Sequence, residues 1–144
     1  MPDCRERTLV GAPLETVWAV LMDKAEHPHR YIEGVLDARV LERGDGWIRR
    51  ELELPGAVFL EERVEVDEAR RQVRFTLERH PDYRGHVVNH LRPTADPASC
   101  ELDFEMRWEA LGGQPDDQAA VDLLRCAIQR TRAISEEVAR MAGA

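Results

Sequence analysis

The sequence predicts an α+β protein in which a curved antiparallel β-sheet of about seven strands wraps around one long C-terminal α-helix. Three observations lead to this fold class. Residues 116–141 carry apolar and small side chains at three- and four-residue spacing. Residues 36–109 contain several runs that alternate between apolar and polar side chains, separated by Gly and Pro. The length of 144 residues suits one domain, so we expect a single domain over residues 1–144.

The C-terminal helix is expected from Asp116 to Met141, with Pro115 at its first position and acidic residues in its first turn. At about 1.5 Å per residue, such a helix is roughly 39 Å long and needs a broad apolar surface. The residues predicted to face that surface are Ala120, Leu124, Ala127, Thr131, Ile134, Val138 and Met141.

The N-terminal part is expected to form a strand over Cys4–Val10 and then a short helix that opens at Pro13. Residues Leu14, Val17, Trp18 and Leu21 share one face of that helix. Because Pro28 interrupts the segment from Lys24 to Glu33, we expect a broken helix or a lid-like loop there.

The remaining strands are expected at 36–41, 47–54, 58–66, 72–77, 86–92 and 100–109, joined by short turns. Alternation assigns one face of each strand to the core. In the strand at 86–92 the inner set is Val87, Asn89 and Leu91, because the other choice would bury His86 and His90. A slip of one residue would reverse these assignments.

Composition excludes several functions. The net charge is -8, with 20 Lys and Arg against 28 Asp and Glu, so the chain is not expected to bind nucleic acid. No apolar run approaches the roughly 18 residues of a membrane span, and the first residues lack the apolar stretch of a signal peptide, so we expect a cytoplasmic protein. Its three cysteines have no C-x-x-C spacing, which argues against a disulfide framework.

Neither a metal nor an organic cofactor is predicted. The pairs His27/His29 and His86/His90 have spacings found in metal sites but lack a third ligand. Gly44-Asp45-Gly46 is a hairpin turn rather than a phosphate-binding loop. No Ser or Cys has an identifiable base as partner, so no catalytic residue is assigned.

A family resemblance supports the predicted fold. The segment Gly-Ala-Pro-Leu-Glu-Thr-Val-Trp at 11–18 resembles the opening of START/Bet v 1-like (SRPBCC) domains. Residues 27–35 and 48–51, Glu61-Glu62 and the strand around Asn89 resemble the AtaL-like family of small bacterial and fungal proteins. The resemblance implies a helix-grip fold with a ligand cavity between sheet and helix. It does not imply one chemistry, because the superfamily includes binding proteins, cyclases and other modules.

Three polar residues are candidates for the cavity. If the hairpin turns about Gly56, Arg50 lies opposite Glu62 on the face that also carries Leu52 and Leu60. Asn89 then projects toward the same space. Arg50 would orient a ligand carboxylate, enolate or phenolate, and Glu62 would act as a base or hydrogen-bond acceptor. The alternative is a neutralised ion pair near the cavity mouth, or a register slip that turns both residues outward.

Other candidates would form the walls of the cavity. Ala120, Ala127 and Thr131 are small where a filled core would carry larger residues, although small residues also let a helix approach a sheet closely. His27, His29 and Tyr31 would either gate the entrance or lie in a solvated loop. The predicted wall residues, each of which is also compatible with ordinary core packing, are Trp18, Tyr31, Phe75, Phe104, Met106, Trp108 and Thr131.

Three functions therefore remain open. The first is binding of a small hydrophobic or aromatic ligand with a polar or acidic end. The second is a cyclase, dehydratase or isomerase that uses the same cavity for acid–base chemistry. The third is a protein-interaction module. A homodimer contact through Trp47 and Phe59 is also open, because alternation exposes both and a hairpin would set them opposite each other.

Overall fold

Within residues 3–112 and 116–143, the part of the chain that this computed structural model describes, seven antiparallel strands form one sheet in the order β1-β7-β6-β5-β4-β3-β2. Consecutive strands from β2 to β7 are neighbours, and β1 pairs with β7. The elements are β1 (Asp3–Val10), α1 (Leu14–Glu26), the 3₁₀ turn η1 (Pro28–Arg30), β2 (Asp37–Gly44), β3 (Trp47–Leu54), β4 (Val58–Asp67), β5 (Gln72–Arg79), β6 (Tyr83–Pro93), β7 (Cys100–Ala110) and α2 (Asp117–Gly143).

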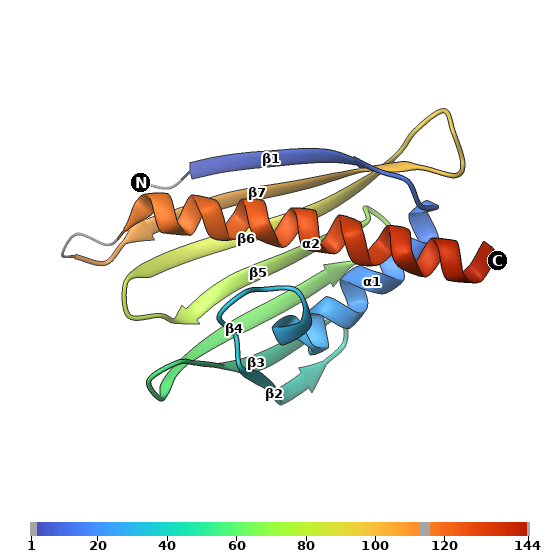
Figure 1. Cartoon of the computed structure of the whole chain (residues 1–144). Helices are drawn as coiled ribbons and strands as arrows, with labels where there is room; N and C mark the ends of the chain where they lie inside the picture. The colour runs from blue at the N-terminus through green and yellow to red at the C-terminus, as the bar shows by residue number, and fades with distance from the viewer. Residues whose placement is uncertain (1–2, 113–115, 144) are drawn as a thin grey trace.

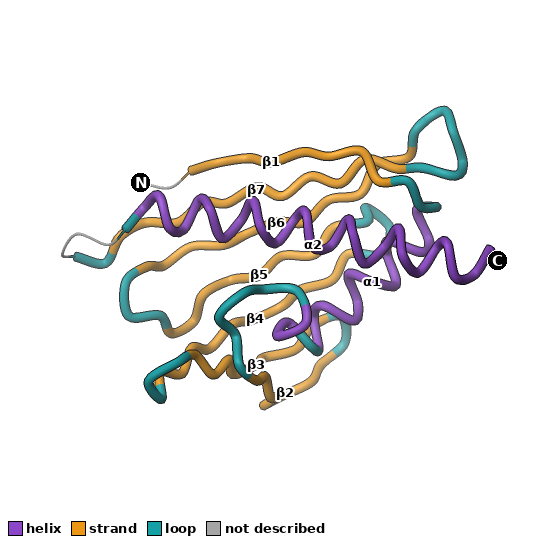
Figure 2. The backbone as a smooth tube through the Cα atoms, viewed as in Figure 1, coloured by secondary structure: helices purple, strands orange, loops and turns teal. Residues whose placement is uncertain are grey.

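Both helices lie on one face of the curved sheet. Figure 1 shows α2 running along β1 and β7, with α1 beside its C-terminal half. The loop between η1 and β2, drawn teal in Figure 2, crosses the same face, where Val35 packs on Leu52 and Leu60. The other face of the sheet is rich in charged side chains. The predicted α+β helix-grip fold is confirmed.

The β3–β4 hairpin has the predicted register. Its strands pair Leu54 with Val58, Leu52 with Leu60 and Arg50 with Glu62. Gly56 and Ala57 turn the chain with φ of 82° and 58°, a left-handed region that Gly adopts without strain. The pairing of β4 with β5 shifts between Glu61 and Glu62, so a β-bulge lies directly beside the buried carboxylate.

The inner faces also follow the predicted alternation. Val87, Asn89 and Leu91 point inward, while His86 and His90 are half-buried on the opposite face. Strand β7 contributes the inward set Cys100, Leu102, Phe104, Met106 and Trp108. These residues and the apolar faces of α1 and α2 form one continuous core.

The last turns of α2 differ from the prediction. Its buried stripe runs through Ala120, Leu124, Ala127, Ile128, Thr131 and Ser135. Ile134 is only half-buried, Val138 is 43% exposed and Met141 is 71% exposed. After Thr131 the predicted residues therefore no longer lie on the face of α2 that contacts the protein core. Ser135 is buried there instead, and its hydroxyl donates to the Thr131 carbonyl. The expected role of Pro115 lies outside the described residues.

The segment from Lys24 to Glu33 takes the broken-helix form, one of the two forms expected for it. Helix α1 continues to Glu26, so Lys24 belongs to its last turn, and the η1 turn follows at Pro28–Arg30. One expectation was wrong. Trp47 and Phe59 do not face each other, because the register pairs Trp47 with Glu65 and Phe59 with Glu53. The Trp47 ring instead packs against the guanidinium of Arg63, 4.2 Å from the ring centroid.

Candidate ligand cavity

A cavity of about 470 Å³ lies between the inner face of the sheet, the N-terminal half of α2 and the loop after η1. This volume is in the range of sites for small organic ligands. Most of its walls are apolar. Of the residues predicted from sequence, those that line it are Arg50, Glu62, Phe75, Phe104, Met106 and Trp108.

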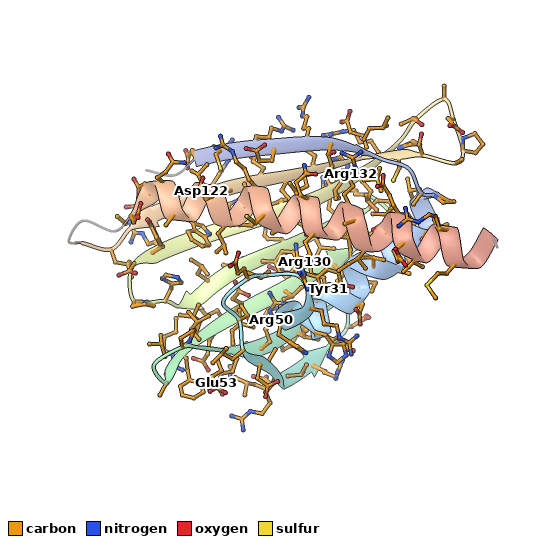
Figure 3. The ribbon with its side chains drawn as sticks, viewed as in Figure 1. Tyr31, Arg50, Glu53, Asp122, Arg130 and Arg132 are labelled. Atoms are coloured by element: carbon orange, nitrogen blue, oxygen red, sulfur yellow. The ribbon has the colours of Figure 1, made fainter. Side chains whose placement is uncertain are left out.

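Arg50 is buried at the inner end of the cavity, where only 1% of the residue is exposed. Its Nε and Nη2 donate to Oε1 of Glu62 at 3.0 and 2.6 Å. Its Nη1 donates to the backbone carbonyls of Lys24 and Ala25 at 3.1 and 2.7 Å. In Figure 3 the Arg50 side chain projects from β3 toward the end of α1. These four bonds use most of the guanidinium's donors, so few are left to bind a ligand. Arg50 instead fastens the end of α1 to the sheet, and we call this set of bonds the Arg50 clasp.

The sequence explains why α1 needs this clasp. Pro28 has no backbone N–H and therefore cannot bond the carbonyl of Lys24, four residues earlier. A helix end leaves such carbonyls unsatisfied and carries partial negative charge. Arg50 supplies both the missing donors and a positive charge, and it thereby fixes the last turn of α1 against β3 and β4.

Lys24 lies in that last turn and lines the cavity, and sequence reasoning missed it. It is 3% exposed. Its Nζ donates to Oδ1 of Asn89 at 2.7 Å and lies over the faces of Phe104 and Phe75, 4.1 and 4.9 Å from the ring centroids. The amine is therefore held by one amide oxygen and two aromatic faces.

Burial lowers the pKa of Lys24 from 10.5 to about 7. The positive charge of Arg50 lowers the pKa further, while the carboxylate of Glu62 partly opposes the shift. Because Arg50 and Glu62 already neutralise each other, the charge of the cluster depends on whether Lys24 carries its proton. Near neutral pH the amine is therefore present in both protonation states.

Two signals in the sequence could have identified Lys24. It is the only lysine in the chain, and the rest of the 20 basic residues are arginine. It also continues the apolar face of α1, since it follows Val17 and Leu21 at helical spacing. A lysine on a buried helical face needs a polar partner, and Asn89 provides it.

The other predicted residues lie outside the cavity lining. Asn89 is fully buried behind Lys24, and its Nδ2 has no hydrogen-bond partner within the described chain. Trp18 packs beneath the guanidinium of Arg71. The Tyr31 hydroxyl donates to Asp23 at 2.6 Å, and burial together with this bond raises its pKa. Thr131 bonds the Ala127 carbonyl within α2 at 2.8 Å.

The outer end of the cavity carries aromatic and polar side chains. The rings of Trp108, His80 and Tyr83 form a cluster of tilted contacts, with the Trp108 centroid 5.6 Å from that of His80 and 5.0 Å from that of Tyr83. The indole nitrogen of Trp108 is buried and has no hydrogen-bond partner within residues 3–112 and 116–143. Tyr83 donates to Asp117 of α2 at 2.7 Å, which joins the start of β6 to the start of the helix. Neither His27 nor His29 lines the cavity, so the expected histidine gate is not formed by these two side chains.

The described residues, 3–112 and 116–143, also bear on two other functions. No group of three or more His, Cys, Asp or Glu side chains in that part of the chain is arranged to hold a metal ion. No helix there combines the length and apolar character needed to cross a bilayer.

The sequence matches a family model described as polyketide cyclase/dehydrase and lipid transport over residues 1–140. The chain belongs to this family. Among curated proteins, none matches the sequence. The family assignment agrees with the START-like resemblance predicted above, whereas the AtaL-like subfamily stays a prediction.

Solved structures share the fold of this polyketide cyclase/dehydrase and lipid transport family member. A START superfamily protein from Mycobacterium smegmatis has a TM-score of 0.74 at 16% identity, with 94% of this chain and 98% of that chain covered. The Zhui aromatase/cyclase from a Streptomyces species has a TM-score of 0.63 at 20% identity, covering 95% and 89%. The di-domain aromatase/cyclase StfQ of the steffimycin pathway has a TM-score of 0.69 at 18% identity, covering 92% and 44%. At these identities the likeness is one of fold.

Proposed function

We propose that this protein binds a small hydrophobic ligand with a polar or acidic end, and that Lys24 holds that end. The observation that carries the proposal is the position of the chain's only lysine, buried at the inner end of a mostly apolar cavity of about 470 Å³. Burial of the ligand's apolar body supplies affinity, and one polar contact fixes its orientation.

The amine has capacity for such a contact. An ammonium has three N–H donors, and Asn89 takes one of them. A carboxylate, phenolate or enolate would complete the shell and favour the protonated amine, whereas a neutral carbonyl would accept one bond. At the outer end, the indole N–H of Trp108, which has no partner among the described residues, offers a second donor. A ligand with an apolar body and oxygen atoms at its ends fits both.

The pKa of Lys24 favours a second candidate, an acid–base enzyme of the cyclase, dehydratase or isomerase type. A general base or acid works best when its pKa lies near the working pH, and that of Lys24 is about 7. Glu62 lines the same cavity, and within the described residues its Oε2 accepts no hydrogen bond. Two proteins of the same fold are described as aromatase/cyclases, which makes this class of chemistry worth testing.

Native mass spectrometry of gently purified protein tests the binding proposal. Lys24→Met is a sharper variant than Arg50→Ala, because removing Arg50 also unpairs Glu62 and the end of α1. We expect the wild type to carry a small molecule, or to bind members of a panel of fatty acids, flavonoids and aromatic polyketides. Lys24→Met should weaken binding of the ligands that have an acidic or carbonyl end by about tenfold or more.

Arg74→Met is the matched control, since Arg74 is exposed on the outer face of β5 and should leave binding unchanged. Equal binding by wild type and Lys24→Met would remove Lys24 from the site. No binding of any panel member by the wild type would overturn the cavity proposal itself. Turnover of an aromatic polyketide by the wild type would favour the enzyme candidate, and loss of that rate in Glu62→Gln with binding retained would give Glu62 an acid–base role.

A further inference from the structure

We infer that Lys24 is a nucleophile that forms a reversible imine with the carbonyl group of an apolar aldehyde or ketone bound in the cavity. The inference deepens the proposed function and rests on it, because it requires the ligand to occupy the same cavity. It narrows the ligand to the carbonyl class and assigns Lys24 a covalent role.

The position of the amine supports this role. Nζ lies 4.1 Å from the Phe104 ring centroid and 4.9 Å from that of Phe75, and both rings line the cavity. Because Nζ itself covers these ring faces, a carbonyl compound bound in the cavity would pack beside the rings with its carbonyl carbon toward Nζ. Asn89 accepts one N–H at 2.7 Å, which fixes the side chain at the inner end of the site.

The surrounding charges favour a nucleophile over a permanent cation. Nucleophilic lysines are those desolvated in an apolar pocket or placed beside another cation, and Lys24 meets both conditions. An ammonium anchor would be better served by a neighbouring carboxylate free to pair with it. Here Arg50 donates two hydrogen bonds to Oε1 of Glu62, the carboxylate that acts on Lys24, so the charge of Glu62 is balanced by Arg50 while its Oε2 can still accept a proton.

The chemistry balances without any other reactant. The ammonium first loses one proton to Glu62, whose carboxylate lines the same cavity. The nitrogen lone pair then forms the C–N bond while the carbonyl π pair moves to oxygen. The oxygen collects two of the three protons that the ammonium held, the C–O bond breaks, and water leaves. The product is an iminium that keeps the third proton and the positive charge, and water reverses the reaction.

An iminium changes what the bound ligand can do. Its positive nitrogen draws electrons from the adjacent carbon, so a proton on that carbon becomes easier to remove. Glu62 lies in the same cavity and offers Oε2 as acceptor. The same imine would therefore hold a carbonyl ligand in a binding protein and would activate its α-carbon in an enzyme.

Reductive trapping tests the inference, and the sequence makes the test clean because Lys24 is the only lysine. The full chain is incubated with 2-naphthaldehyde or 4-phenyl-2-butanone and sodium cyanoborohydride at pH 7. Peptide mapping then separates a secondary amine at Lys24 from one at the N-terminal amine. Binding of each probe without reductant is measured in parallel by tryptophan fluorescence, since Trp108 lines the cavity.

The variant Arg74→Lys places a second lysine on the exposed outer face of β5 as an internal control. At pH 7 fewer than about one in a thousand ordinary lysine side chains is unprotonated, against about half for a group of pKa 7. We therefore expect Lys24 to be labelled about a hundredfold faster than the introduced lysine. Lys24→Arg keeps the charge but should abolish the cavity adduct.

Each other outcome is decisive. Saturable binding of both probes with no adduct at Lys24, or with an adduct only at the N-terminus, would overturn the imine and leave the binding proposal standing. Equal labelling of Lys24 and the introduced lysine would also overturn it. If neither probe nor any member of the panel above binds, the cavity proposal and the imine fail together.

Discussion

The Nζ atom of Lys24 lies 2.7 Å from Oδ1 of Asn89, and this bond joins the last turn of α1 to the inner face of β6. The two residues are 65 positions apart in the sequence. The bond gives the buried amine its polar partner and turns Asn89 into a supporting residue behind the cavity wall. The polar end of the cavity is therefore built from Lys24 together with Arg50 and Glu62, with Asn89 in support.

The depressed pKa of Lys24 makes stability depend on pH. Lys24 titrates near 10.5 in the unfolded chain and near 7 in the folded protein, where Arg50, Glu62 and Asn89 face it. Between these values the unfolded state binds more protons, so the free energy of unfolding rises with pH by up to ~1 kcal/mol per unit and levels off on either side. Urea unfolding at several pH values measures the slope.

Other groups also titrate between pH 7 and pH 10.5. Comparing Lys24→Met with the wild type therefore isolates the contribution of Lys24 to the pH dependence of stability. The variant should gain stability relative to the wild type below pH 7, and the difference should shrink as pH rises toward 10. A constant difference between the two proteins from pH 6 to pH 10 would contradict the buried, titrating amine.

Loss of Arg50 should destabilise the fold strongly. Arg50→Met leaves Glu62 buried without its partner and leaves two carbonyls of α1 without donors, so we expect a loss of about 3–5 kcal/mol in urea unfolding. The double variant Arg50→Met/Glu62→Met should recover part of that loss, because no charge is then left unpaired.

The exposed pair Arg39–Glu51 supplies the comparison. Arg39 is 71% exposed, so Arg39→Met should cost less than about 1 kcal/mol. A similar loss of unfolding free energy for Arg50→Met and Arg39→Met would show that the buried bonds of Arg50 stabilise the fold no more than an exposed ion pair does.

Asp103 should support the sheet at neutral pH. It is 2% exposed on the outer face, where Arg5 donates to it at 2.7 and 3.0 Å and Arg92 at 3.0 Å. Burial alone would raise the pKa of the carboxyl, but the hydrogen bonds from the two arginines outweigh it and hold the pKa below its usual range. Stability from this group is present above the unfolded pKa near 4 and is lost as pH falls through the lower folded value.

Asp103→Asn should therefore cost about 2 kcal/mol at pH 7 in urea unfolding. The difference from the wild type should narrow toward pH 3, because the carboxyl of the unfolded chain, with its pKa near 4, takes up a proton before the folded one does. A penalty that is the same at both pH values would show that lost packing, rather than the charge, is responsible.

Filling the cavity should separate binding from folding. Ala127 of α2 lines the cavity, so Ala127→Leu places a larger side chain in its space. We expect binding of the panel ligands to fall by about tenfold or more while the thermal midpoint stays the same or rises, because added apolar contacts replace empty space. Ala133→Leu adds the same side chain on the exposed face of α2 and should leave binding unchanged. Equal binding by the two variants would place the ligand elsewhere.

Much of the fold could be predicted because the strands alternate cleanly. A strand with one buried face fixes its own register, since a slip of one residue would bury Glu51 and Glu53 in place of Leu52 and Leu54. The same alternation, with a turn about Gly56, is enough to place Arg50 opposite Glu62. In α2 the pattern failed after Thr131, because small and polar residues such as Ser135 fit the contact face as well as Ile134 does.

The candidate site was only partly predictable. Alternation put Arg50 and Glu62 on the inner face, and both line the cavity. It could not show that Arg50 donates hydrogen bonds to two backbone carbonyls at the end of α1. Trp18, Tyr31 and Thr131 were predicted wall residues because they are aromatic or lie on an inner face. Each is instead buried outside the cavity lining, with its own neighbours.

By itself, the sequence determined the order of the strands and helices, the inner face of nearly every strand, the Arg50–Glu62 pair and the presence of a single lysine. These follow from local periodicity, from hairpin geometry and from composition. Only the tertiary structure decided where Lys24 lies, because its partner Asn89 and its aromatic neighbours come from distant strands. The pKa of an amine depends on the solvent and charges around it, so folding, rather than the residue type, turns this lysine into a group poised near neutral pH.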